Sequence, residues 1–379
     1  MAEQFTTLAS LTVDGKGSYG IGASAVPFSK DLYTYLRITD IKDDGTLNLQ
    51  DLKSVDDEKA SEYLLKPNDI VFARTGASTG RNYFYDGMDG EFVYAGFLIK
   101  FSIDEKKVNP KYIKYFCQSK QYKDWINSFN TGSTRGNINA QTLGKMPIPL
   151  IERTAQDALV SILSSIDEKI KKNNEINNNL EQQADALYQT FFSPKSGTQG
   201  KVVTLDEYCS IFTGKKNANA SVNCGKYKFF TCAPEALQID SYIFDGNAII
   251  VSGNGAYTGR TRFYSGKFDL YQRTYACTLL DNVNPDFIFP LYWFVKLELS
   301  KKIMGGTRGS AIPYIVMNDL AKFEFIYNEE MFANYTPLFK SLTEAIQSNE
   351  FESENLAQIR DSLLPKLMSG ELDVSDIEL

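Results

Sequence analysis

The chain has 379 residues and no histidine. Histidine is the commonest general base and metal ligand near neutral pH, so its absence makes catalysis less expected, although carboxylates and lysine remain available. No uncharged apolar run approaches the roughly 18 residues that a membrane-spanning helix needs. The first residues also lack the basic stretch and apolar core of a secretory signal. The sequence therefore predicts neither a membrane span nor export.

Cysteine is scarce, and its spacing shows no metal-binding or disulfide pattern. None of the five cysteines forms a Cys-x-x-Cys pair; they are Cys117, Cys209, Cys224, Cys232 and Cys277. Neither a zinc site nor a disulfide framework is indicated, and no metal ligands are predicted. This usage fits a reducing cytoplasm.

Excess positive charge is also missing, since the net charge is −7. Residues 1–153 carry 19 basic and 19 acidic side chains, and residues 201–334 carry 14 and 13. The acidity therefore lies on the segments 154–200 and 335–379. Two nearly neutral regions remain, either of which can present a basic face to nucleic acid.

One long stretch without glycine or proline organises the chain, from Thr154 to Phe192. Its heptad positions repeat every seven residues, at Leu159, Ile166, Asn173, Leu180 and Leu187. Ile162 and Ile176 are expected at the intervening seam positions. The pattern predicts one long helix with a narrow coiled-coil seam, and a buried Asn173 would fix its register.

The partner of this helix is expected in the same chain. The same seam recurs 176 residues later, at Tyr335, Leu342, Asn349, Leu356 and Leu363. Either segment alone could be a surface helix of an ordinary domain. Two matching seams, each with an asparagine at one position, favour an antiparallel intramolecular coiled coil.

The domains before the two helices also repeat. The segments 68–85, 108–120 and 131–139 match 245–264, 283–299 and 305–313. We expect a pseudo-twofold α+β protein with two repeated domains of mostly antiparallel strands. The expected parts are a first domain 1–153, a helix 154–192, a linker 193–200, a second domain 201–334, a helix 335–370 and an acidic tail 371–379.

Short runs rich in Val, Ile, Phe and Tyr predict the strands of the first domain. The expected strands are 34–41, 69–75, 81–86, 91–103 and 145–151. Proline at its start and apolar residues at three-to-four spacing predict one helix over 110–128.

Two short motifs occur in both domains. Gly-x-x-Thr-Gly-Arg occupies 76–81 and 255–260, and Thr-Arg-Gly occupies 134–136 and 307–309. Glycines permit a tight turn, and an arginine beside it can bind a phosphate or the edge of guanine. A hairpin turn with a solvated arginine is the plainer interpretation. If the turns bind DNA, the contacting residues are expected to be Arg74, Ser78, Thr79, Arg81, Thr134, Arg135, Asn137, Tyr257, Thr258, Arg260, Arg262, Thr307 and Arg308.

Neither glycine pattern predicts a nucleotide site. A phosphate-binding P-loop needs four residues between its glycines and a following lysine, whereas three separate Gly76 from Gly80. Gly15, Gly17 and Gly20 match Gly-x-Gly-x-x-Gly, but Pro27 interrupts any following helix. We therefore expect a loop at residues 15–20.

The two helix regions carry a family resemblance. The segments 159–192 and 356–379 resemble the central and C-terminal conserved regions of specificity subunits of bacterial type I restriction–modification systems. The segment Met-Pro-Ile-Pro-Leu-Ile (146–151) before the first helix also fits. The resemblance implies two target-recognition domains, each reading one half of a bipartite, asymmetric DNA site.

The same resemblance implies the partners and their chemistry. Two methyltransferase subunits would transfer the methyl group of S-adenosylmethionine to adenine, and restriction subunits would use ATP and Mg²⁺. This chain would hold no cofactor and perform no catalysis, and it would bind double-stranded DNA in the bacterial cytoplasm, at the nucleoid. Two alternatives stay open. One is the specificity subunit of a combined restriction–methylation enzyme outside type I, and the other is a coiled-coil scaffold without DNA binding.

Overall fold

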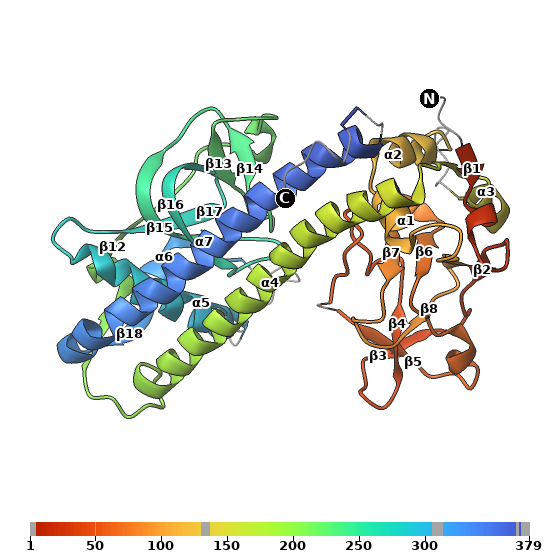
Figure 1. Ribbon diagram of the computed structural model, residues 1–379. Coiled ribbons are helices and arrows are strands. Elements are labelled where there is room, and N and C mark those ends of the chain that lie inside the picture. The colour runs from red at the N-terminus through yellow and green to blue at the C-terminus, as the bar shows by residue number, and fades with distance from the viewer. Residues whose placement is uncertain (1–4, 50, 130–136, 305–313, 369–370, 373–379) are drawn as a thin grey trace. The chain divides into compact units, whose positions relative to one another are not determined.

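The computed structural model describes residues 5–49, 51–129, 137–304, 314–368 and 371–372. The chain divides into two compact units, Met1–Ile170 with Glu354–Leu379, and Lys171–Ser353. Each unit therefore contains one β-rich domain and one segment of each long helix (Figure 1).

Two four-stranded sheets form the domain of the first unit. One has the order β2-β9-β6-β7 and the other β3-β5-β4-β8, while β1 pairs with β10. The strands are β1 Phe5–Thr7, β2 Ser18–Tyr19, β3 Ala25–Pro27, β4 Tyr33–Leu36, β5 Lys53–Val55, β6 Asp69–Ala73, β7 Asn82–Tyr85, β8 Phe92–Tyr94, β9 Leu98–Ser102 and β10 Pro147–Pro149. Three helices accompany them, α1 Pro110–Phe116, α2 Lys120–Asn127 and α3 Ala140–Gly144.

One six-stranded sheet forms the domain of the second unit. Its order is β12-β17-β15-β16-β13-β14, and β11 pairs with β18. The strands are β11 Lys201–Thr204, β12 Cys209–Thr213, β13 Tyr227–Phe230, β14 Leu237–Ile239, β15 Phe244–Ser252, β16 Thr261–Leu270, β17 Thr274–Leu279 and β18 Glu324–Tyr327. The helices are α5 Ile288–Met304 and α6 Met317–Ala321, and α5 contacts β15 and β16.

The two domains share a topology. The order β2-β9-β6-β7 corresponds to β12-β17-β15-β16, and in both domains the first and last strands pair, β1 with β10 and β11 with β18. Of the strand pairings in the described ranges, only β4–β8 and β13–β16 are parallel. The predicted α+β class, the repeat and the mostly antiparallel sheets are confirmed.

In the first domain, one expected helix and one expected strand are each divided in two, and another strand is shorter than expected. The helix expected over 110–128 is two helices, because the Ser119 hydroxyl accepts a hydrogen bond from the Tyr122 amide and caps a new helix. The strand expected over 91–103 is also two, separated by a turn in which the Leu98 amide donates to the Ala95 carbonyl. The expected strand over 34–41 ends at Leu36.

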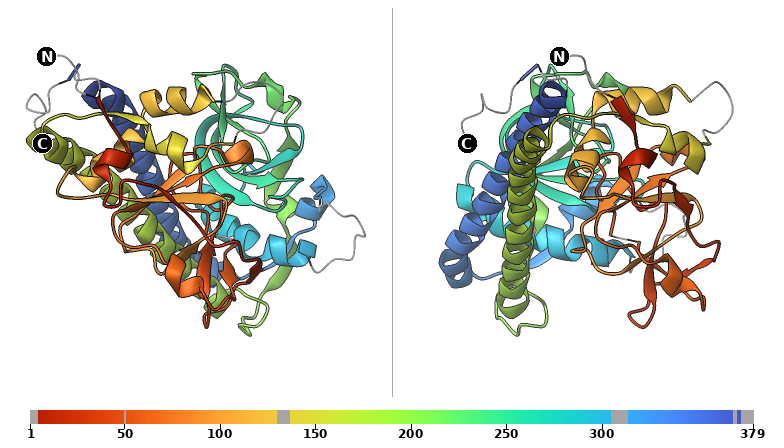
Figure 2. Two further views of the ribbon diagram at one scale, coloured as in Figure 1. Left: turned by 90° about the vertical axis from the view of Figure 1, so that its right-hand side faces the viewer. Right: turned by 45° about the vertical axis from the view of Figure 1, so that its right-hand side comes forward.

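The two long helices are α4 Arg153–Phe191 and α7 Glu329–Met368. The second begins at Glu329 rather than at Tyr335. In the second unit they lie side by side and antiparallel (Figures 1 and 2): Phe191 stacks on Tyr335 with ring centroids 4.3 Å apart, and Asn177 bonds to the carbonyl of Ile346. In the first unit, α4 contributes Leu159 and Leu163 and α7 contributes Leu364 and Leu367 to one core.

Burial follows the expected seam at most positions and departs from it at Ile176. Leu159, Ile162 and Asn173 are buried, and the other members are half-buried, namely Ile166, Leu180, Leu187, Tyr335, Leu342, Asn349, Leu356 and Leu363. Ile176 is 38% exposed, whereas Asn177 is 8% exposed. At this point of α4 the buried position is therefore Asn177, one residue later than expected.

A polar layer interrupts the apolar seam between the helices of the second unit. The Asn173 side-chain amide donates to Glu352 Oε2 at 2.8 Å and to Ser353 Oγ at 3.2 Å, and the Asn349 amide donates to Asn177 Oδ1 at 2.8 Å. Each bond spans both helices, so a shift of one helix turn would leave these buried amides unpaired. The layer therefore specifies the register of α4 and α7.

In the first unit a half-buried carboxylate joins α1 to both long helices. Asp167 of α4 accepts hydrogen bonds from Lys114 Nζ at 2.9 Å, from the Tyr115 hydroxyl at 2.9 Å and from Arg360 of α7 at 3.0 Å. Burial alone would raise the pKa of Asp167, but the attraction of Lys114 and the bonds from these donors hold it below its usual value.

The substitution Asp167→Asn is expected to lower the free energy of unfolding by about 1.5 kcal/mol at pH 7, because it removes charged hydrogen bonds. The folded-state pKa is depressed, so this stabilisation is present above the unfolded value of about 3.9 and is lost as the pH falls through the folded value. Urea unfolding between pH 7 and pH 3 measures it, and the two proteins should converge at the acid end. Asp124→Asn is the matched control, since the Asp124–Lys120 pair is exposed and worth less than about 0.5 kcal/mol. An equal effect of both substitutions would contradict the prediction.

Candidate nucleic-acid interface

The recurring Gly-x-x-Thr-Gly-Arg motif forms the same turn in both units. It links β6 to β7 in the first unit and β15 to β16 in the second. Thr79 donates its hydroxyl to the Gly76 carbonyl at 2.8 Å, and Thr258 donates to Gly255 at 2.8 Å. The four glycines have positive φ, from 73° at Gly76 to 88° at Gly80. The glycines and the threonine therefore shape the turn, which explains why these residue types recur.

Backbone pairing places the chain that follows the second recurring motif beside the first motif. In the first unit Asn137 forms a bridge with Thr75, and the Ile138 amide donates to the Arg74 carbonyl at 2.9 Å. In the second unit Tyr314 forms a bridge with Asn254, and the Ile315 amide donates to the Gly253 carbonyl at 2.8 Å. Thr134, Arg135, Thr307 and Arg308 lie outside the described residues. In both units, described residues that follow the Thr-Arg-Gly motif in sequence thus pair beside the turn, from Asn137 in the first unit and from Tyr314 in the second.

The equivalent arginines of the two turns have different surroundings. Arg81 forms an ion pair with Asp43, with Nε 2.7 Å from Oδ1 and a second bond of 3.2 Å to Oδ2, and it also donates to the Ile41 carbonyl. Arg260 is exposed and lies over the ring of Tyr257, with 5.8 Å between the guanidinium carbon and the ring centroid. Asp43 thus offsets the charge of the first turn, while an aromatic ring supports the arginine of the second.

A second arginine accompanies each turn. Arg262 follows the turn of the second unit, lies over the Phe230 ring at 5.7 Å and donates to the Ala233 carbonyl. Burial lowers the pKa of Arg262, and the nearby charge of Arg260 lowers it further. Arg74 precedes the turn of the first unit and lies over the Tyr19 ring at 5.0 Å. Each turn therefore sits beside two guanidinium groups.

The structure brings all nine of the described candidates to the two turns. Ser78, Thr79, Arg74 and Arg81 lie in or next to the first turn with Asn137 paired alongside, and Tyr257, Thr258, Arg260 and Arg262 lie in or next to the second. Sequence reasoning missed Tyr19 and Asp43. Tyr19 lies inside the glycine pattern of residues 15–20, which was the available signal. Asp43 is 38 residues from Arg81, and no sequence pattern links them.

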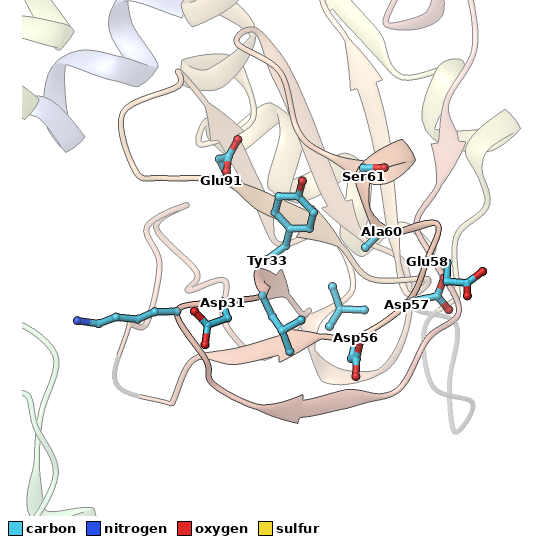
Figure 3. Close-up of a pocket in the computed structure, with 11 residues that line it drawn as sticks. Asp31, Tyr33, Asp56, Asp57, Glu58, Ala60, Ser61 and Glu91 are labelled. Carbon is cyan, nitrogen blue, oxygen red and sulfur yellow. The ribbon is translucent and has the colours of Figure 1, made fainter.

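The first domain also contains a pocket of about 510 Å³ (Figure 3). It is lined by Asp31, Asp56, Asp57, Glu58 and Glu91, with Lys30 and Tyr33 among its other residues. Such a surface repels phosphates, so nucleic acid is not expected there. Within the described ranges, no group of three metal-binding side chains is present, and no helix is long and apolar enough to cross a membrane.

The fold defines a protein with two copies of one α+β domain and one pair of long helices, of which each unit contains a segment of both. The family profile of the type I restriction modification DNA specificity domain matches residues 29–182 and 199–327. The chain belongs to this family. Its two matched segments correspond to the two copies of the repeat.

Individual relatives agree with this assignment. The chain is 35% identical over 177 residues to the specificity subunit of the EcoDI type I restriction enzyme of Escherichia coli, a match that spans 45% of this chain and 38% of that subunit. It is 22% identical over 311 residues to the MjaIX specificity subunit of Methanocaldococcus jannaschii, covering 73% and 72% of the two chains. The crystal structure of a type I S subunit from M. genitalium has the same fold, with a TM-score of 0.58, 18% identity, and coverage of 97% and 96%.

Proposed function

We propose that this chain is the DNA sequence-recognition subunit of a type I restriction–modification complex. Each domain reads one half of a bipartite, asymmetric site, and the helix pair sets the gap between the halves. Phosphate contacts position each domain, and side chains of the turn read base edges. The observation that carries the proposal is the repeated arrangement of an arginine-bearing turn beside the segment that leads from the Thr-Arg-Gly motif.

In this proposal the chain performs no chemistry of its own. Partner subunits supply adenine methylation from S-adenosylmethionine, and restriction subunits supply ATP- and Mg²⁺-dependent translocation and cleavage. The chain contributes two reading surfaces and the helix pair that holds methyltransferases beside them. Its lack of histidine is compatible with a purely recognising role.

Deletion of the gene is expected to abolish adenine methylation at one two-part motif with a fixed gap. Genome-wide mapping of methylated adenines in the intact, deleted and complemented strains measures this. Purified chain with its neighbouring methyltransferase should also bind duplexes carrying that motif, with an affinity that falls steeply as salt rises. An unchanged map together with salt-independent or absent DNA binding would favour the scaffold alternative.

A further inference from the structure

The glycine pattern of residues 15–20 has a structural role. Ser18 and Tyr19 form β2, which pairs with β9 so that Tyr19 lies opposite Ile99. A Cβ atom on Gly17 would lie 2.6 Å from the Phe101 ring, and one on Gly20 would lie 2.2 Å from the Tyr94 carbonyl oxygen. Side chains at both positions would therefore push β2 off the sheet. The glycines allow the close approach that places Tyr19 at the candidate interface.

Tyr19 contacts both segments that meet there. Its ring lies under the Arg74 guanidinium at 5.0 Å, and its hydroxyl accepts a hydrogen bond from the Ala140 amide at 3.1 Å. The Tyr19 side chain is nevertheless 42% exposed, so the stack forms part of the surface. One aromatic residue thus joins the residue that follows β6 to the start of α3.

Arg74 has one buried donor that no described residue satisfies. Its Nε is buried and, within the part of the chain that the structure describes, has no hydrogen-bond partner. The other arginine of this turn, Arg81, is engaged by Asp43. An arginine stacked on an aromatic ring has a fixed plane, and a fixed plane favours the two-bond contact with O6 and N7 of guanine over a single contact with phosphate.

Among the described residues, the second domain has no arginine–aromatic stack at the position equivalent to Arg74. Gly253 occupies the position of Arg74, and a Cβ atom there would lie 2.6 Å from the Tyr275 ring and 2.4 Å from the Arg273 carbonyl oxygen. The two domains therefore present different chemistry beside the same turn. This difference suits an asymmetric site whose halves differ in sequence.

We propose that Arg74 reads a guanine in the half-site of the first domain and that Tyr19 is the positioning residue that fixes the plane of its guanidinium. The proposal rests on the proposed function. It assigns one G·C pair to the first domain and adds Tyr19, with Gly17 and Gly20, to the residues that determine specificity.

The test compares adenine-methylation maps of strains carrying Arg74→Lys, Tyr19→Leu, Tyr19→Phe or wild-type protein. Arg74→Lys keeps the charge but loses the fork, and should relax one G·C position of one half-site by about tenfold. Tyr19→Leu should relax the same position by roughly threefold to tenfold, since the guanidinium plane is no longer held. Tyr19→Phe keeps the ring and should retain the wild-type motif. Tyr33→Leu, at the acidic pocket of the same domain, is the matched control and should leave the motif unchanged.

The second half-site serves as an internal standard for folding. If Arg74→Lys and Tyr19→Leu reduce methylation evenly at all sites, Arg74 contacts phosphate or the stack is only structural, and the proposal is overturned. It is overturned equally if both variants keep the wild-type motif, or if the first half-site contains no G·C pair. Failure of the proposed function looks different, because then the wild-type chain itself would direct no methylation motif.

Discussion

Replacing Trp293 by alanine is expected to lower the free energy of unfolding of the second unit by about 3–5 kcal/mol, since it empties a large volume in a packed core. Trp293 lies on α5 and is fully buried. Its ring packs against Tyr292 at 5.0 Å, and Lys296 Nζ lies over it at 4.9 Å. The indole N–H donates to Thr343 Oγ1 of α7 at 2.9 Å. Trp293 therefore joins the second domain to its long helix through both packing and a buried hydrogen bond.

The effect should stay within the second unit. Each unit has its own core, and the core that contains Trp293 is built from residues of the second unit. Hydrogen exchange measured by mass spectrometry should show faster exchange in α5, β15 and the adjoining part of α7, and little change in the first domain. Trp125→Ala is the matched control, because Trp125 is the other tryptophan, lies half-buried in the first unit and should affect that unit alone. Uniform exchange changes in both units would contradict this independence.

Trp293→Phe separates packing from hydrogen bonding. Phenylalanine retains most of the buried ring but loses the donor to Thr343, so about 1–2 kcal/mol is expected from the lost bond and the small void. Thr343 keeps its own bond to the Phe339 carbonyl at 2.7 Å, which limits the cost. Urea unfolding followed by circular dichroism should rank the proteins as wild type, Trp293→Phe and Trp293→Ala in decreasing stability. A phenylalanine variant as unstable as the alanine variant would place the whole effect in the hydrogen bond.

In the first unit, the contact between the domain and its long helix is made by a carboxylate and a tyrosine hydroxyl instead of a tryptophan and a threonine. Asp167 and Thr343 are 176 residues apart, the spacing of the helix repeat, and each binds an aromatic donor from the helix of its own domain. The donor is the Tyr115 hydroxyl in one unit and the Trp293 indole in the other. The hydrogen bond between domain and long helix thus occurs at equivalent positions of the two repeats, but its donor and acceptor differ.

Long-range regularity made the architecture predictable from sequence. The two long helices follow from seven-residue periodicity, and the repeat follows from direct similarity of segments. Predictions failed where a few long-range contacts decide the outcome. Strands of two or three residues, such as β2 and β5, have too little pattern to detect, and their pairing depends on residues far away in the chain.

The seam error has a specific cause. Choosing the apolar Ile176 over its polar neighbour follows the rule that apolar residues fill a helix interface. Asn177 is buried instead, because Asn349 on the facing helix donates to its side-chain oxygen and its amide donates to the Ile346 carbonyl. Burial of an amide is stable when a partner is present, and a single helix sequence does not reveal that partner.

The sequence predicted the two turns of the candidate interface, but it did not predict which of their arginines form ion pairs. Recurrence of the motifs indicated both turns, and glycine spacing indicated their tight geometry. Whether an arginine is paired depends on residues that only the fold brings near, as with Asp43 beside Arg81. The different surroundings of Arg81 and Arg260 therefore predict unequal contributions to binding, which the substitutions Arg260→Ala and Arg81→Ala can test.

Arg260→Ala is expected to weaken binding of the assembled complex to its site by about 1–3 kcal/mol, roughly 5- to 150-fold, and to relax one position of the second half-site. Arg81→Ala should cost less than about 1 kcal/mol. In the wild type, the ion pair between Arg81 and Asp43 must break before Arg81 contacts DNA, and exposed pairs of this kind contribute little.

Removing the carboxylate of Asp43 should have the opposite effect on binding. Asp43→Asn releases Arg81 and removes a negative charge beside the phosphates, so affinity should rise, most at low salt.

Titration of duplexes at two salt concentrations measures all three variants, with Arg260→Lys as the charge-preserving control. If Arg260 reads a base edge, the lysine variant loses selectivity but keeps the salt slope, because the charge is unchanged while the fork is lost. If Arg260 only neutralises a phosphate, lysine restores binding and alanine lowers the salt slope by about one. Equal losses for Arg81→Ala and Arg260→Ala would mean that the Asp43 ion pair opens at no cost on binding. Asymmetry between the two turns would then arise from Arg74 and its aromatic support rather than from the motif arginines.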